Sequence, residues 1–203
     1  AYTALLRDLV LLDKSLILVD HDAARGFGRH RRIDVWWGGL DQNGGLMLLL
    51  ARLLREQRAW RDAEVRFQMI VDHEKQVAAA EERLEALLRE AKVRARRHVH
   101  VRATREVRAV IGQESAPADL VILGLRRPPR HVEDEGYVSR VSALLRRLPT
   151  TLLVRASGAF EGAPMVLEDA TDEGNREAPV VSEGLAVRPA VPSLTPAPRK
   201  SSP

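Results

Sequence analysis

The sequence predicts an open, mostly parallel α/β sheet of about six strands with helices on both faces, followed by a disordered C-terminal tail. Strand-like and helix-like segments alternate through residues 1–158, as in parallel strands joined by right-handed crossovers. Several strand segments are unbroken apolar runs, which strands covered on both faces require. Residues 159–203 hold seven of the 11 prolines and no sustained periodicity, so they bury too little apolar surface to become ordered.

Local patterns predict the elements of the first half. Leucine and valine at helical spacing predict a helix over 2–12, and the run SLILV predicts a strand buried on both faces over 15–19. The polar, glycine-containing segment 21–32 is expected to be a loop. IDVWW predicts a strand over 33–37, and a leucine-rich helix follows over 46–57. Two residues are candidates for the N-cap of this helix, Asp41 and Asn43.

The second half repeats the alternation. Four strands are expected over 64–71, 98–102, 119–125 and 151–155. In the first of them, Val65, Phe67 and Met69 share one face, and Arg66 and Gln68 share the other. Helices are expected over 74–93, 104–111 and 137–148.

Composition excludes several classes of protein. The chain of 203 residues has no cysteine, which excludes disulfide scaffolds, thiolate metal sites and thiol catalysis. Its longest dense apolar stretch, 46–54, is too short to span a membrane, so we expect no membrane insertion of this segment. The chain begins with Ala1 and not with Met, which suggests a piece of a longer protein.

The net charge of +4 is unevenly divided. Residues 159–203 carry four basic and seven acidic side chains, a net −3, and residues 1–158 therefore carry +7. Nucleic-acid binding would require basic residues interleaved with aromatic ones on one face. Only eight aromatic residues are present, so we expect no nucleic-acid partner.

Sequence motifs for catalysis, metal binding or anion binding are weak. No Gly-x-Ser-x-Gly elbow is present. His98 and His100 share a strand face but lack an evident third metal ligand, so no metal and no cofactor is expected. Asn43-Gly44-Gly45 precedes a helix, where bare glycine N–H groups form either an anion nest or only a tight turn.

The tryptophan pair Trp36 and Trp37 must point to opposite faces of its strand. Both side chains are then either core residues or, for one of them, an interface anchor.

These residues carry a family resemblance. The segment from Asp34 through Trp36, Trp37 and Asn43-Gly44-Gly45 into the leucine-rich helix resembles the cytosolic C-terminal domain of the cation–chloride cotransporters. Later segments match in order: Trp60 before a strand, the apolar run ADLVILGL of 118–125 with its two prolines, and LLVR of 152–155. Asn43 stands where the family has an acidic residue, and the spacing from Trp37 to Gly44 is longer than in animal members. The sequence therefore resembles a bacterial member.

The resemblance implies a universal-stress-protein-like fold and a non-enzymatic role. The expected function is a regulatory and dimerisation domain, over residues 1–158, of a transporter that moves chloride with potassium or sodium. The expected partners are its own transmembrane domain, which lies outside this sequence, and a second copy. The expected location is the cytoplasmic face of the cell membrane. The motif residues Asp34, Trp36, Trp37, Asn43, Gly44 and Gly45 are expected to have structural or interface roles. The alternative is a free-standing stress-protein-like domain that binds a nucleotide at the Gly44 turn.

Overall fold

The computed structural model describes residues 12–38, 43–125 and 135–160. The chain divides into two units, Ala1–Glu168 and Asp169–Pro203, and every described residue belongs to the first. The helix predicted over 2–12 and nearly all of the predicted tail lie outside the described residues. No helix of the described ranges is long and apolar enough to cross a membrane.

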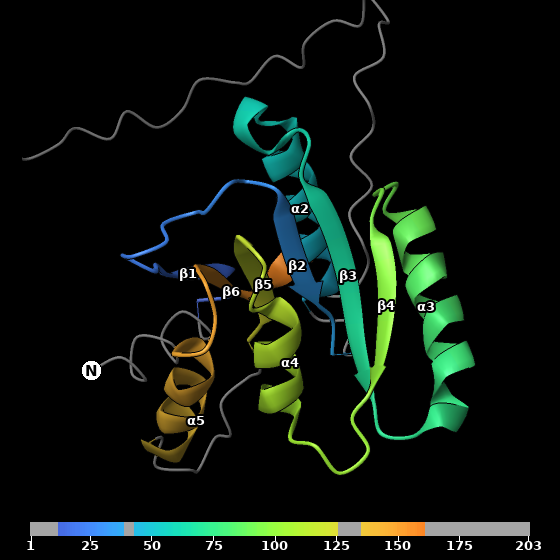
Figure 1. Cartoon of the computed structure of the whole chain (residues 1–203). Helices are drawn as coiled ribbons and strands as arrows, with labels where there is room; N and C mark the ends of the chain where they lie inside the picture. The colour runs from blue at the N-terminus through green and yellow to red at the C-terminus, as the bar shows by residue number, and fades with distance from the viewer. Residues whose placement is uncertain (1–11, 39–42, 126–134, 161–203) are drawn as a thin grey trace, which may run out of the picture. The chain divides into compact units, whose positions relative to one another are not determined.

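A single six-stranded sheet forms the centre of the described unit (Figure 1). Its strands follow the order β1-β6-β5-β2-β3-β4, and only β1 runs antiparallel to its neighbour. Because β2 has β3 on one side and β5 on the other, the winding direction of the chain reverses between β2 and β5. The strands are β1 (Leu16–Asp20), β2 (Arg32–Trp36), β3 (Glu64–Val71), β4 (Arg96–Val101), β5 (Leu120–Gly124) and β6 (Thr151–Arg155).

Helices cover both faces of this sheet, which confirms the predicted fold class. The front of the sheet in Figure 1 carries α4 (Val107–Ser115) and α5 (Glu135–Leu145). The back carries α2 (Gly44–Glu56) and α3 (Val77–Glu90). Each face has its own buried apolar cluster, centred on Phe67 and Ile33 behind and on Val121 and Leu123 in front. Short 3₁₀ turns complete the described elements: η1 (Arg58–Trp60), η2 (Glu74–Gln76) and η3 (Gly158–Phe160).

Strand β3 shows how the sequence fixes the two layers. Val65 and Phe67 are buried in the rear cluster beneath α2 and α3. Arg66 and Gln68 lie on the front face, where they reach α4 and β4. This alternation and the bounds of β3 agree with the sequence prediction.

The strand β1 forms as predicted, but its predicted burial was wrong. The apolar run was expected to be buried on both faces, but β1 is an edge strand paired antiparallel with β6. Leu16 and Leu18 pack against the front cluster, whereas Ile17 and Val19 are 42% and 57% exposed. The sequence pattern of an apolar run does not show which strand lies at an edge.

Two helix boundaries also differ from the prediction. Residues 74–76 form η2, and α3 ends at Glu90 because Lys92 adopts a left-handed φ of 51°. The helix predicted over 104–111 begins only at Val107, since Ala103 has a φ of 49° and Glu106 is extended. It then continues to Ser115.

The loop before β2 is held by Asp119. Its carboxylate accepts hydrogen bonds from the backbone N–H groups of Arg29, Arg31 and Arg32 at 3.0, 2.7 and 3.0 Å. Burial would raise the pKa of Asp119, but these donors hold it below its ordinary value. Gly28 has a φ of +57°, and a Cβ there would lie 2.1 Å from Asp119 Oδ1. Only glycine therefore fits this turn.

Candidate functional site

The motif residues cluster around the carboxyl ends of β2, β5 and β6, where α2 begins. In open α/β sheets, ligands bind outside the carboxyl ends of the strands at the point where the winding reverses. Here that point lies between β2 and β5. Residues 39–42 and 126–134, which adjoin this end of the sheet in sequence, are outside the described ranges. The contacts of each described motif residue show whether it is used inside the fold or is free to bind a ligand.

Asp34 is a buried ion-pair partner in β2. Its side chain is completely buried, and Arg66 of β3 donates to it through Nε and Nη2 at 2.7 and 2.5 Å. Ser115 of α4 donates to the same carboxylate at 2.7 Å. Burial would lower the pKa of the Arg66 guanidinium, but the hydrogen bonds and charge of Asp34 hold it above the ordinary value. A two-pronged pair of this kind fixes the position of both side chains.

Trp36 extends the same polar cluster on the front face. Its indole Nε1 donates to Ser115 Oγ at 2.8 Å, and only 5% of the residue is exposed. Its ring lies 5.2 Å from that of His100. His100 Nε2 in turn shares a hydrogen bond of 3.0 Å with Gln68 Oε1. Asp34, Arg66, Ser115 and Trp36 therefore form one hydrogen-bonded network that joins β2, β3 and α4.

Trp37 points to the opposite face, as the alternation of a strand predicts. It is 4% exposed and its ring stacks on Phe67 at 6.1 Å. The guanidinium of Arg83 in α3 lies 5.0 Å from the ring centroid, a cation–π distance. The indole Nε1 is buried and has no hydrogen-bond partner among the described residues. Trp37 thus packs between the sheet and the two rear helices.

Asn43 joins three elements through its side chain. Its Nδ2 donates to the carbonyl of Leu125 at 3.1 Å, and its Oδ1 accepts from the N–H of Ala156 at 2.9 Å. It stands at the N-cap position of α2 but makes no side-chain cap hydrogen bond. The prediction that Asn43 could cap this helix through its side chain was therefore wrong, because that side chain ties the ends of β5 and β6 to the start of α2.

The two glycines that follow Asn43 are buried. A Cβ on Gly44 would lie 3.2 Å from Nε1 of Trp37, tighter than an ordinary contact. The bare backbone at Gly44 therefore permits the start of α2 to approach Trp37 closely. This contact supports the tight-packing interpretation over an open anion nest.

The histidine pair of β4 does not form a metal site with described residues. The rings of His98 and His100 stack at 6.3 Å. Within the described ranges, no group of three or more histidine or acidic side chains could hold a metal ion. The described residues therefore supply no third metal ligand beside His98 and His100.

The sequence interpretation missed Arg66 and Ser115. A signal for Arg66 was present: an aspartate inside an apolar strand requires a buried partner, and β3 carries a single arginine. Nothing local marked Ser115, because its role depends on how α4 docks on the sheet.

Comparisons with known proteins agree with this architecture. Residues 22–102 match the family model of solute carrier family 12. The fold is similar to the crystal structure of the cytoplasmic domain of a prokaryotic cation chloride cotransporter, with a TM-score of 0.58 and 21% sequence identity. That match covers 78% of this chain and 58% of that chain, so this chain spans less than two thirds of its length. Among proteins of curated function, none matches the sequence.

The family match includes Asp34, both tryptophans and the glycine turn, which are the residues that carry the resemblance. The structural similarity covers 78% of this chain and therefore extends beyond these motif residues. The resemblance of this chain to the cytosolic C-terminal domain of the cation–chloride cotransporter family is therefore confirmed in sequence by residues 22–102 and in fold by most of the chain.

Proposed function

We propose that this chain is the cytoplasmic regulatory and dimerisation domain of a membrane transporter that moves chloride together with potassium or sodium. Transport itself would take place in a membrane domain outside this sequence. The observation that carries the proposal is the family match over 22–102, together with the α/β architecture. The role is non-enzymatic, because the motif residues are used for internal hydrogen bonds and packing.

The proposed regulatory role is supported by the way the motif joins the two faces of the sheet. Trp36 belongs to the front cluster and Trp37 to the rear one. Asn43 connects the beginning of α2 to β5 and β6. A displacement of α2 would therefore change side-chain contacts on both faces of the sheet. The predicted extent of the domain, residues 1–158, and the predicted tail over 159–203 are part of this proposal.

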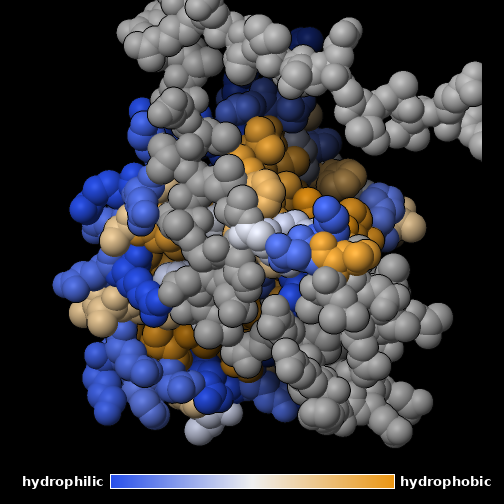
Figure 2. Space-filling model, turned by 180° about the vertical axis from the view of Figure 1, so that it is seen from behind, coloured by the Kyte–Doolittle hydropathy of each residue, from blue (hydrophilic) through white to orange (hydrophobic). Residues whose placement is uncertain are grey.

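Self-association is supported by exposed apolar side chains on the rear face. Leu53 of α2 is 42% exposed, and Ile17 and Val19 of β1 project from the same side of the sheet. Figure 2 looks at this face and shows hydrophobic side chains gathered at its surface. Exposed apolar surface on a folded domain often marks a protein–protein contact.

Two measurements test the transport proposal. The coding sequence upstream of Ala1 should contain about a dozen apolar segments of roughly 20 residues. The complete protein in proteoliposomes should then take up chloride only when potassium or sodium is supplied, and exchanging the cations identifies the partner ion. An upstream sequence without apolar segments, or chloride flux without dependence on either cation, would contradict the proposal.

The alternative function, nucleotide binding, has a separate test. Calorimetry with ATP and with AMP should show no binding, because Gly44 packs under Trp37 and Asn43 is engaged by β5 and β6. Tight binding that disappears in Gly45→Val, while circular dichroism stays unchanged, would favour the stress-protein-like alternative.

A further inference from the structure

The amino ends of the parallel strands gather basic charge that the proposed function does not use. Segments leading into β2, β3, β4, β5 and β6 meet at one end of the sheet, from which β3 and β4 start in Figure 1. Together they carry 12 basic and four acidic side chains, a net +8. We call this surface the basic end, and it consists of residues 21–32, 57–64, 91–97, 116–119 and 146–150.

The other end of the sheet has no such excess in its described segments. Residues 12–15, 72–76, 102–106 and 156–160 lie there and hold four basic and four acidic side chains, a net charge of zero. An arginine-rich composition alone would distribute basic residues over the loops at both ends. The difference between the two ends therefore indicates a surface selected for a negatively charged partner.

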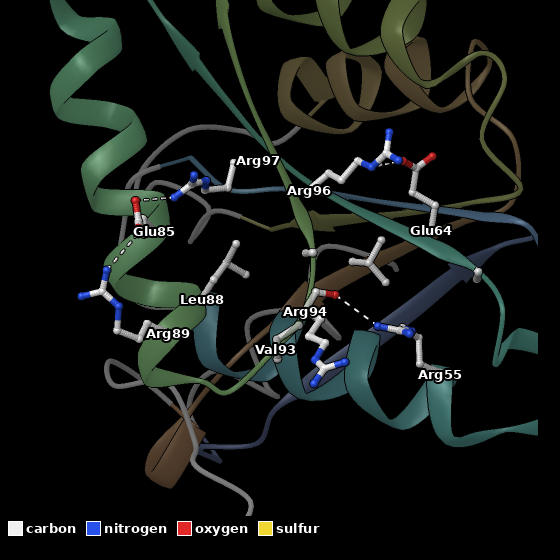
Figure 3. Close-up of a pocket in the computed structure, with 12 residues that line it drawn as sticks. Arg55, Glu64, Glu85, Leu88, Arg89, Val93, Arg94, Arg96 and Arg97 are labelled. Carbon is white, nitrogen blue, oxygen red and sulfur yellow. Dashed lines mark hydrogen bonds and ion pairs between the residues drawn. The ribbon is translucent and has the colours of Figure 1, made fainter.

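The basic end is hollowed in two adjoining places. The larger hollow, of about 600 Å³, lies between the last turns of α2 and α3 and has five arginines around an apolar floor that includes Val65 and Leu88 (Figure 3). The smaller, of about 360 Å³, is lined by Arg29 and Arg31 among others. Glu64 lines both hollows, so the basic surface continues from one to the other.

The larger hollow offers guanidinium groups to an anion. Glu64 is already shared by Arg96 and Arg32, at 2.9 and 3.6 Å. The side chain of Arg94 is exposed and pairs with no carboxylate of the described ranges. Arg55 donates through Nη1 to the carbonyl of Arg94 at 3.2 Å, but its Nε is buried without a hydrogen-bond partner in that part of the chain. Phosphate oxygens are strong acceptors for such donors.

An exposed aromatic side chain stands within this basic surface. Phe27 is 39% exposed and belongs to the loop 21–32. Its ring centroid lies 5.8, 6.5 and 6.4 Å from those of His21, His30 and Trp60, and these contacts fix its position in the loop. An aromatic ring surrounded by arginines suits the boundary between lipid headgroups and acyl chains.

We infer that the basic end docks on an anionic phospholipid surface, with headgroup phosphates in the arginine-lined hollow and Phe27 at the depth of the headgroups. The inference rests on the proposed function, which places the domain at the cytoplasmic face of a membrane, where the leaflet is negatively charged. A nucleic acid fits less well. Single-stranded binding uses several aromatic platforms, and the basic end exposes only Phe27.

Vesicle sedimentation with the full chain tests this docking. The chain should bind vesicles of phosphatidylcholine that contain about 30% phosphatidylserine, and it should not bind phosphatidylcholine alone. Binding should be lost between 0.1 M and 1 M salt, since the Debye length shrinks from about 10 to about 3 Å.

Matched charge variants identify the surface. Arg94→Glu should reduce the vesicle partition coefficient about fivefold or more. Arg105→Glu makes the same change of charge at an exposed position of the other end and should leave the partition coefficient unchanged. Phe27→Ser keeps the charge and should weaken binding roughly threefold or more. Circular dichroism checks that each variant is folded.

The absence of cysteine allows the orientation to be measured. An environment-sensitive fluorophore on Ala59→Cys, exposed at the basic end, should brighten when anionic vesicles are added. The same fluorophore on Thr104→Cys, exposed at the other end, should not. Equal brightening at both positions would contradict the proposed orientation.

Other results would also overturn the inference. Equal binding to neutral vesicles, or equal effects of Arg94→Glu and Arg105→Glu, would remove the specific role of the basic end. Release of the chain from vesicles by micromolar inorganic phosphate would identify a free-anion site. Tighter binding of single-stranded RNA, weakened by Arg94→Glu, would assign the surface to nucleic acid. Absent vesicle binding alongside cation-dependent chloride uptake by the complete protein would remove this inference and leave the transport proposal standing.

Discussion

At the scale of single residues, Asp34 has the most demanding environment. Its buried carboxylate accepts hydrogen bonds from Arg66 and Ser115, and Ser115 also accepts from Trp36. Asp34→Ala leaves the mostly buried guanidinium of Arg66 without its counter-charge, and breaking a buried pair costs about 3–5 kcal/mol. We expect urea unfolding to show this loss, with folding abolished if the domain is only marginally stable.

Matched variants separate charge from shape. Asp34→Asn keeps the volume and an acceptor for Ser115 but removes the charge, so it should still weaken the domain. Glu106→Gln breaks an exposed pair with Arg108 and should not move the unfolding midpoint, because exposed pairs contribute little. An Asp34→Asn variant as stable as the original would show that the charge of the pair is unimportant.

His100 gives the domain a predicted pH response. Burial lowers its pKa below 6.5; His98, Arg66 and Arg105 lower it further, and Glu114 opposes them. The folded state therefore binds the proton less well than the unfolded state, so its stability is complete above about pH 6.5 and is lost as pH falls through the lowered pKa.

The measurement is urea unfolding at pH 7.5 and at pH 5.5. The original chain should lose stability on acidification, and His100→Gln should lose less. Glutamine cannot take up a proton and still offers an amide to Gln68. Equal losses in both chains would contradict the assigned role of His100.

At the scale of elements, Asn43 holds the start of α2 against the ends of β5 and β6. Asn43→Ala leaves the carbonyl of Leu125 and the N–H of Ala156 without their partner. The expected loss is about 1–3 kcal/mol, measured by urea unfolding. Hydrogen exchange should quicken at Ala156 and at the beginning of α2, and it should not change in β4.

Asn43→Asp is the informative comparison, because the resemblance leads us to expect an acidic residue here. Aspartate still accepts from Ala156 and can cap α2, but it cannot donate to Leu125. We therefore expect a smaller loss than in Asn43→Ala. A larger loss would mean that the carboxylate is repelled by the Leu125 carbonyl.

The elements were predictable from the sequence to different degrees, for physical reasons. β3 and β6 have the predicted bounds because alternation and apolar content are local properties. The edge position of β1 was not predictable, since it depends on pairing with β6 at the other end of the chain. The network around Asp34 was only partly predictable: its aspartate stands out in an apolar strand, but Ser115 arrives through the docking of α4.

At the scale of the whole molecule, the two faces of the described unit differ in chemistry. The front face buries the polar network under α4. The rear face exposes Leu53 of α2, and Leu49, Leu50 and Leu54 of the same helix are only partly buried. Apolar side chains left exposed on a folded domain often mark a protein–protein contact. The rear face is therefore the expected place for a partner, and the front face for internal stability.

This asymmetry predicts the outcome of a charge-insertion experiment. Leu53→Glu should leave the unfolding free energy within about 0.5 kcal/mol, as for most surface substitutions, while weakening self-association at least tenfold, or about 1.4 kcal/mol. Val107→Glu, on α4 of the front face with 46% exposure, is the matched control and should not affect association. Sedimentation equilibrium over a range of concentrations measures the self-association of both variants.

Because a tethered domain acts at high effective concentration, weak dimerisation of the isolated chain would be sufficient for the proposed role. A chain that stays monomeric at the highest concentrations, or equal behaviour of the two variants, would rule out the rear face as the dimer contact.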